Sequence, residues 1–191
     1  HEQKCGYHFT PRDYFEQNPS EKEKFAENSF RSYAPIKEAK PIATSYIDLD
    51  IVNQSLRGYP ANKLFQFLSA QFGETGTLKL MKRYKVGTSK YWDGATVFWQ
   101  TDNQNKVRTG KIMLYNSETG KRIKEPYNHV TWVHSVLHKG DYNLKQCFFG
   151  EHLLPEDKSR PVALVESEKT TLIASYYCLL YTSDAADDLI G

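Results

Sequence analysis

The chain has 191 residues, of which 39% are hydrophobic and 25% charged, as is ordinary for a soluble globular protein. A formal net charge of +2 does not by itself indicate nucleic-acid binding, so local basic clusters must carry any such argument. Apolar runs stay shorter than the ~18 residues of a membrane helix, and the polar N-terminal residues do not resemble a signal peptide. The three cysteines are too few to indicate a disulfide framework. We expect a cytoplasmic protein without membrane contact, whose natural start lies upstream of His1.

The first predicted elements are a short helix and a polar linker. Thr10 and Pro11 predict a helix that runs to about Gln17, because Thr suits the N-cap and Pro suits the first helical position. Residues 18–45 are polar and charged with scattered prolines, and we interpret them as a linker.

Two helices follow the linker. Asn62 is the predicted N-cap of a helix that ends at Gly73. A second helix is predicted from about Thr75 to Arg83, followed by an extended segment over residues 84–87. The apolar face of the first helix consists of Leu64, Phe65, Leu68 and Phe72.

A β-hairpin is predicted in the middle of the chain. Residues 95–101 and 107–115 are rich in strand-forming residues, and the polar residues 102–106 between them suit a turn. A short helix over residues 143–148 is also expected.

Basic residues cluster on this hairpin and on the turn that follows it. Alternate side chains of a strand point to opposite faces, so Arg108 and Lys111 fall on different faces of the sheet. The cluster forms no single stripe, and it suits either contacts with phosphate groups or ordinary solvated charges. Its members are Arg108, Lys111, Lys121, Arg122 and Lys124.

Aromatic and histidine side chains in the same region leave alternatives open. Tyr91, Trp92, Trp99 and Trp132 suit either base stacking or a place in the core. The histidines lack the fixed spacing of a metal site, so we interpret them as structural or surface residues. They are His129, His134 and His138.

The strongest local pattern lies near the end of the chain. Residues 162–165 form a short continuous apolar run, typical of a strand buried on both faces, and residues 168–177 look helical. Glu166 directly follows the run. Ligands gather at the carboxyl ends of parallel strands, where a carboxylate can hold Mg²⁺ against phosphate oxygens. The alternative is that Glu166 is a solvated turn residue.

The last residues match a translated sequencing-library adapter. Residues 178–187 read Cys-Leu-Leu-Tyr-Thr-Ser-Asp-Ala-Ala-Asp, as that adapter does. We therefore expect residues 178–191 to be an artefact and not part of the fold, the alternative being a genuine acidic tail. Any domain that begins near residue 160 is then incomplete.

Residues 162–170 resemble the first motif of the Toprim domain, the catalytic core shared by bacterial primases and topoisomerases. Glu166 matches the family's acid–base Glu, and Ser167 stands where Gly is usual. The resemblance implies a Mg²⁺ or Mn²⁺ site to which Glu166 contributes. The family's second motif, an Asp-x-Asp on a later strand, is not present in this chain, so the site is incomplete.

Other segments resemble Toprim-containing primase-like proteins of bacterial mobile elements in the same order. Residues 5–15 resemble the tail of a zinc ribbon, which implies that Cys5 is one ligand of an incomplete Zn²⁺ site. Residues 94–100 and 106–115 resemble the central hairpin of primases, and residues 148–151 resemble their short aromatic-Gly element.

The resemblance implies an α+β protein with five segments. They are a zinc-ribbon remnant (1–17), a linker (18–45), a primase-type N-terminal catalytic subdomain with helices and an antiparallel sheet (46–159), the start of an α/β Toprim domain (160–177) and the adapter-like residues (178–191).

The implied function is DNA priming on a mobile element by metal-dependent nucleotidyl transfer, with Glu166 as the acid–base residue and the fragment itself inactive. Implied partners are single-stranded DNA, nucleoside triphosphates and a helicase. Two rival functions stay open, a Toprim nuclease and a non-catalytic accessory protein that binds single-stranded DNA.

Overall fold

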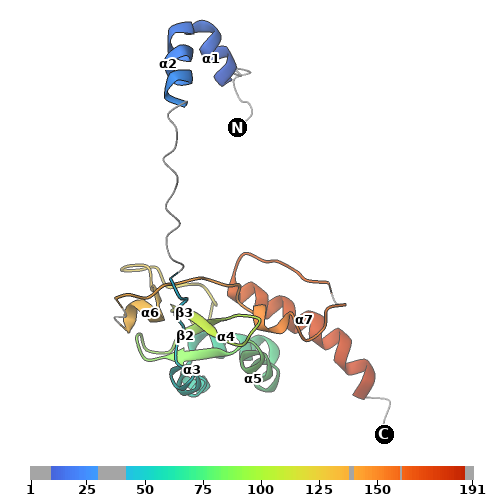
Figure 1. The fold of residues 1–191 in the computed structure, drawn as a ribbon. Coiled ribbons are helices and arrows are strands. Elements are labelled where there is room, and N and C mark those ends of the chain that lie inside the picture. Colours follow the sequence, from blue (N-terminus) through green and yellow to red (C-terminus); the bar gives the residue numbers. More distant parts are fainter. Residues whose placement is uncertain (1–9, 30–41, 138–139, 160, 188–191) are drawn as a thin grey trace. The chain divides into compact units, whose positions relative to one another are not determined.

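The computed structural model describes residues 10–29, 42–137, 140–159 and 161–187 (Figure 1). The chain divides into two compact units, residues 1–41 and residues 42–191. Cys5 and His138 lie outside the described residues, so their predicted roles stay predictions. Within the described residues, no helix combines the length and apolar character needed to cross a membrane.

The first unit contains helices α1 (Pro11–Gln17) and α2 (Pro19–Ser29). α1 begins as predicted, because the Thr10 hydroxyl accepts a hydrogen bond from the Asp13 N–H while the Asp13 carboxylate accepts one from the Thr10 N–H. α2 occupies residues that we assigned to the linker. Its Glu and Lys residues are good helix formers, which explains a helix in so polar a segment.

The second unit is built on a four-stranded antiparallel sheet in the order β1-β2-β3-β4. The strands are β1 (Val86–Ser89), β2 (Ala95–Thr101), β3 (Val107–Met113) and β4 (Val130–Trp132). β2 and β3 form the predicted hairpin, in which Phe98 lies opposite Lys111. The mixed α+β fold class is therefore confirmed, with an antiparallel sheet at its centre.

Helices and short turns surround this sheet. They are α3 (Leu49–Ser55), the 3₁₀ turn η1 (Tyr59–Ala61), α4 (Lys63–Phe72), α5 (Glu74–Arg83), α6 (Val133–Val136), η2 (Glu151–Leu153) and α7 (Glu168–Asp187). Phe98 and Met113 belong to a core that includes residues of α4, α5 and α7. Val97 and Trp99 belong to a second core, which includes residues of α3 and α6. Because neighbouring residues of a strand face opposite ways, β2 supplies side chains to both cores.

The predicted N-cap Asn62 is a buried junction between helix and sheet. Its side-chain oxygen accepts hydrogen bonds from the N–H groups of Leu64 and Phe65 and from the Thr96 hydroxyl. Its side-chain NH₂ donates to the Gly87 carbonyl and to the Thr88 hydroxyl. One carboxamide therefore begins α4 and also ties it to β1 and β2.

Helix α7 packs against α4 and α5. Leu172 is fully buried, and the ring of Tyr176 stacks on Phe72 with centroids 4.1 Å apart. Gly76 on α5 permits this approach, because a Cβ there would lie 2.9 Å from the Tyr176 ring. The expected helix after residue 167 is thus present.

Two predicted elements are wrong. Residues 143–148 form no helix, and residues 162–165 form no strand. Val162 and Leu164 are 71% and 79% exposed, so the apolar run is not buried. Backbone groups of a strand need partners, and the described sheet is antiparallel and ends at β4, so this run has no parallel neighbour to pair with.

We expect Asn62→Ala to lower the free energy of unfolding by about 3 kcal/mol, because it removes a helix cap and leaves buried polar groups without partners. Urea denaturation measures this change. The matched control is Asn53→Ala on the exposed side of α3, which should stay within ~0.5 kcal/mol of the parent. Equal losses for both variants would contradict the role given to Asn62.

Candidate nucleic-acid interface

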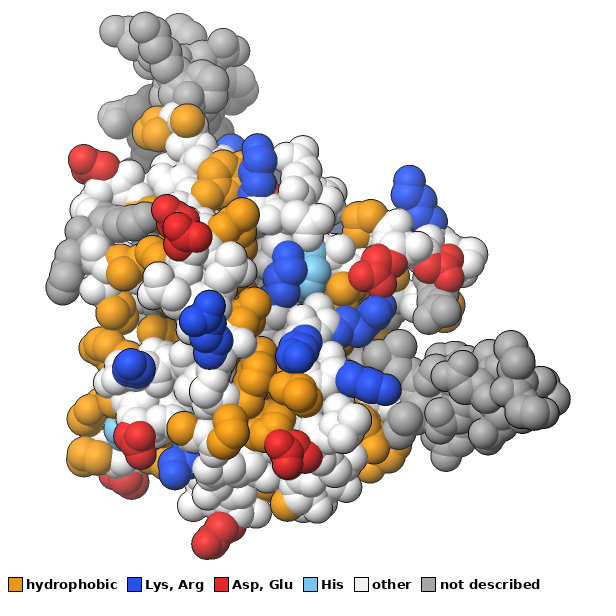
Figure 2. All heavy atoms as spheres, turned by 90° about the horizontal axis from the view of Figure 1, so that it is seen from below, with side chains coloured by type: hydrophobic (Ala, Val, Ile, Leu, Met, Phe, Trp, Pro, Cys, Tyr) orange, Lys and Arg blue, Asp and Glu red, His pale blue; other side chains and the backbone are white. Residues whose placement is uncertain are grey.

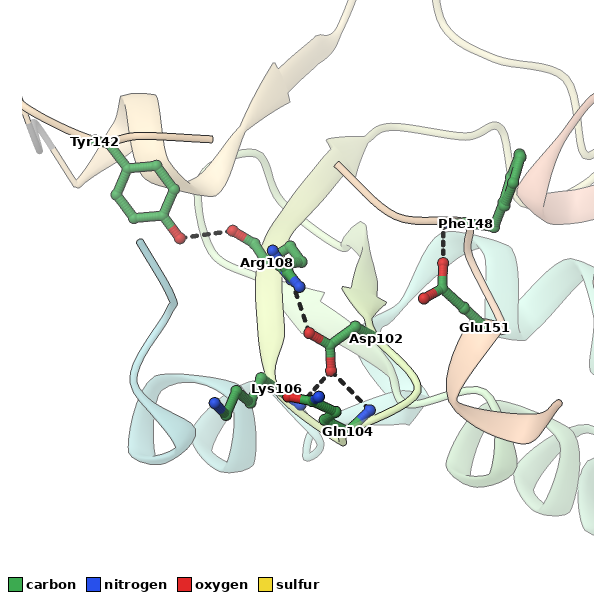
Figure 3. Close-up of polar contacts among 7 residues, drawn as sticks. All are labelled: Asp102, Gln104, Lys106, Arg108, Tyr142, Phe148 and Glu151. Carbon is green, nitrogen blue, oxygen red and sulfur yellow. Dashed lines mark hydrogen bonds and ion pairs between the residues drawn. The ribbon is translucent and has the colours of Figure 1, made fainter. Parts of the chain in front are cut away.

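Asp102 organises the turn between β2 and β3 (Figure 3). Its carboxylate is buried and accepts hydrogen bonds from the N–H groups of Gln104 at 3.0 Å and Lys106 at 2.9 Å. It also pairs with the Arg108 guanidinium at 2.7 Å. Burial alone would raise the pKa of Asp102, but these hydrogen bonds outweigh it and hold the pKa below its ordinary value. The turn is therefore held by a carboxylate that stays ionised.

Arg108, a predicted nucleic-acid contact, instead binds the carboxylate that holds this turn. Besides the ion pair with Asp102, its guanidinium lies over the ring of Tyr46, 5.0 Å from the centroid. Its carbonyl oxygen accepts a hydrogen bond from the Tyr142 hydroxyl at 2.5 Å (Figure 3). A phosphate would have to compete with a buried carboxylate for Arg108, which makes it a poor phosphate contact.

Lys111, a second predicted contact, is also paired. Its ammonium lies 3.0 Å from the carboxylate of Glu168, and both side chains are largely buried. Glu168 opens α7, where a carboxylate also suits the positive end of the helix dipole. Lys111 therefore anchors α7 to the sheet.

Glu166, the predicted catalytic residue, is exposed two positions before Glu168. The Toprim-like motif predicts a functional role for Glu166, whereas in the structure it is Glu168 that pairs with a residue of the sheet. The sequence signal for Glu168 was its place in the first turn of a helix, which does not say which cation it pairs with.

The other three predicted contacts, Lys121, Arg122 and Lys124, are exposed. They follow the turn over residues 116–120 in an extended segment that is tied to the sheet where the Ile123 N–H donates to the Leu114 carbonyl at 3.0 Å. Alternation in an extended segment places Arg122 and Lys124 on the side opposite Ile123. Of the five predicted contacts, these three are the ones open to solvent.

An aromatic cluster, defined as Tyr91, Trp92, Tyr127 and His129, lies beside these cations. The rings of Tyr127 and His129 stack with centroids 4.4 Å apart, and Trp92 meets His129 edge-on at 5.1 Å. Tyr91 meets Trp92 at 4.7 Å. The His129 N–H donates to the Ile123 carbonyl, so the cluster adjoins the segment that carries Arg122 and Lys124. Tyr91 and Tyr127 are 51% and 56% exposed, which leaves ring surface for a ligand.

Two other aromatic candidates have different surroundings. Trp99 is 1% exposed, and its indole N–H donates to the Ser55 hydroxyl at 2.8 Å, so the core alternative is the correct one for it. Trp132 is half-buried on β4. His134 shares a 2.8 Å hydrogen bond with the Thr109 hydroxyl, which gives this histidine a structural partner.

A basic groove, which sequence reasoning missed, lies at the opposite end of β2. It has a volume of about 730 Å³ and is lined by the end of α5, the start of β1, the β2–β3 turn and residues 152–156. Figure 2 shows the lower side of the molecule, where Lys and Arg side chains lie among hydrophobic ones. The cationic residues that line the groove are Lys79, Lys82, Arg83 and Lys85. Their helical spacing was visible in the sequence, but the wall facing them was not.

Lys85 holds an unusual position in this groove. Its φ of +51° lies in the left-handed region, at the residue after the C-cap of α5 where glycine is usual. A lysine there costs about 1 kcal/mol relative to glycine. Burial lowers the pKa of Lys85, and its ammonium donates to the side-chain oxygen of Asn105, a neutral partner, at 3.1 Å.

His152 forms part of the groove wall and is 8% exposed. Its Nε2–H donates to the Arg83 carbonyl at 3.1 Å, which leaves Nδ1 as an unprotonated nitrogen. Nδ1 is buried without a hydrogen-bond partner among the described residues. Burial lowers the pKa of His152, because the charged imidazolium would lose its hydration.

Neither predicted metal site is complete among the described residues. Among them, no three His, Cys, Asp or Glu side chains lie together in a way that could hold a metal ion. Mg²⁺ and Mn²⁺ need several oxygen donors, whereas Glu166 is exposed on a loop, and Cys5 lies outside the described residues.

The lowered pKa of His152 predicts a pH-dependent stability. In the unfolded chain the imidazole takes up a proton near its ordinary value of 6.5, whereas the folded protein resists protonation until lower pH. The stability that neutral His152 contributes is therefore fully present above pH 6.5 and is lost as the pH falls below that value. We expect Tm to decrease between about pH 7 and about pH 5, and His152→Gln to make that decrease shallower. Gln retains an N–H for the Arg83 carbonyl but does not titrate, so an unchanged slope would contradict the assignment.

Comparison with known proteins identifies one family. Residues 62–183, more than half of the chain, match a family described as a domain of unknown function (DUF6371). The matched range begins at the capping residue Asn62 and includes the first residues of the adapter-like segment. Searches of curated proteins and of solved structures found no match. The chain therefore belongs to the DUF6371 family.

Proposed function

We propose that this chain binds single-stranded DNA as part of a longer primase-like protein. The observation that carries the proposal is the aromatic cluster beside the exposed cations Lys121, Arg122 and Lys124. Proteins that bind single strands without sequence preference combine aromatic rings that stack on bases with cations that follow the phosphates. Both kinds of side chain lie at the end of the sheet where β1 connects to β2.

Stacking supplies more of the expected affinity than charge. Asp93 and Glu125 are exposed in the same two loops as the cluster and offset part of the positive charge. Tyr127 presents its ring to solvent while its other side rests on His129. A base that stacks on Tyr127 extends an existing row of rings, so little of the protein has to be rearranged.

The primase-like assignment rests on the order of the sequence resemblances from residue 5 to residue 170. Nucleotidyl transfer belongs, in this proposal, to a longer chain that supplies the Asp-x-Asp carboxylates. A second candidate function is a non-catalytic accessory protein that binds single-stranded DNA. It is favoured by residues 162–165, because this run is exposed and does not form the strand that precedes the catalytic Glu in the Toprim motif. A Toprim nuclease would use the same carboxylates. All three candidates share the surface around Tyr127.

We expect Tyr127→Ala to weaken binding of a fluorescent oligothymidylate about tenfold, since each stacked base contributes ~1–3 kcal/mol. Fluorescence anisotropy of the full chain at fixed salt measures the Kd. Tyr127→Phe keeps the ring and should bind like the parent, which separates stacking from hydrogen bonding. Tyr177→Ala removes an equally exposed tyrosine on α7 and serves as the control. Equal Kd values for Tyr127→Ala and the parent would contradict the proposal.

The catalytic part of the proposal is tested in the uninterrupted gene product. If its continuation supplies Asp-x-Asp on a second strand, Glu166→Gln should reduce primer synthesis by about 10²–10⁴-fold through loss of an acid–base group, with DNA binding unchanged. Glu168→Gln is the matched variant, because it weakens the pair with Lys111 and should lower Tm. Full primer synthesis by Glu166→Gln would exclude the assigned role.

A further inference from the structure

We propose that the basic groove is a binding site for phosphate groups. It is separate from the surface around Tyr127, because its Asn103 and Asn105 lie in the β2–β3 turn whereas Tyr91 and Trp92 lie in the β1–β2 connection. These two connections are at opposite ends of β2. The inference therefore stands or fails independently of the proposed function.

The charges that line the groove favour an anion. Four cations line it, and Glu156 is the only carboxylate among its described lining residues. Glu156 pairs with Arg83 at 2.6 Å, so it neutralises one cation and leaves three. Lys82 and Arg83 also complement the negative end of the α5 dipole, but that dipole does not require Lys79, one turn earlier, or a partly buried cation at Lys85.

Lys85 is the observation that points most directly to a ligand. Lys85 and Asn105 are the two non-glycine residues with positive φ in the described part of the chain, and they meet across the groove. Asn adopts this conformation readily, whereas it is unfavourable for Lys85, and unfavourable backbone conformations are often kept where a ligand is bound. The Lys85 ammonium is partly desolvated and has a neutral partner, so a phosphate oxygen would supply the opposite charge that it lacks.

The groove also has room for a chain of phosphates. It is open to solvent and about 730 Å³ in volume, with cations along the α5 wall and polar Asn103, Asn105 and His152 on the other elements. Such a ligand comes from two sources, the triphosphate of a free nucleotide or the backbone of a nucleic acid. Both present the same oxygens to the lysines.

The position of Lys85 allows a test that separates binding from folding. Lys85→Gly removes the cation and supplies the residue that the left-handed conformation prefers, so Tm should stay equal or rise. Calorimetric titration of the full chain with sodium tripolyphosphate at constant ionic strength should show binding by the parent and about tenfold weaker binding by Lys85→Gly. Lys145→Ala, which removes an exposed lysine elsewhere, should bind like the parent.

A second arm identifies the source of the phosphate. Competition by an oligothymidylate that depends on Lys85 would assign the groove to the nucleic-acid backbone, and competition by a nucleoside triphosphate alone would assign it to free nucleotides. Absence of tripolyphosphate binding, equal affinity for Lys85→Gly and the parent, or an equal loss for Lys145→Ala would overturn the proposal. The oligothymidylate Kd of Tyr127→Ala does not enter these outcomes.

Discussion

The buried carboxamide of Asn62 is the interaction on which both candidate sites depend. It begins α4 and joins that helix to β1 and β2. The next residue, Lys63, donates its N–H to the Gly94 carbonyl at 2.9 Å and so holds the β1–β2 connection that carries Tyr91 and Trp92. At its other end, α4 passes through Gly73 directly into α5, whose last turn forms the wall of the basic groove. The hydrogen bonds of Asn62 and Lys63 therefore help to position both the aromatic cluster and the basic groove.

Two carboxylates decide which cations are available to a ligand. Asp102 holds Arg108, and Glu168 holds Lys111, so the cations in the middle of the hairpin stabilise the fold. The cations beyond the hairpin, near Tyr127, are open to solvent, as are Lys79 and Lys82 on α5. At the end of α5, Arg83 pairs with Glu156, whereas Lys85 has only a neutral partner. Electrostatic attraction for phosphates is therefore concentrated at the two ends of β2 and is weak along its faces.

The segment between η2 and α7 carries most of the Toprim-like motif but does not form the strand that this motif predicts. Its apolar run over residues 162–165 is exposed, although such a run is typical of a buried strand. An exposed run of this composition can pair with another strand, which is also why it is an aggregation risk. Membership in the DUF6371 family covers this segment, α7 and the sheet together, so the run is part of the matched domain.

Elements whose signals lie within a few neighbouring residues could be predicted from the amino-acid sequence. The Asn62 cap, the Gly73 stop and the polar turn between β2 and β3 each need only a few neighbouring residues, and the helices and hairpin that they predict are present. The pairing of Lys111 with Glu168, the burial of Trp99 and the exposure of residues 162–165 could not be predicted in this way, because each depends on which distant segments meet in the fold. The basic groove is of the same kind: its lysines are local to α5, but the wall that faces them comes from residues 103–105 and 152–156.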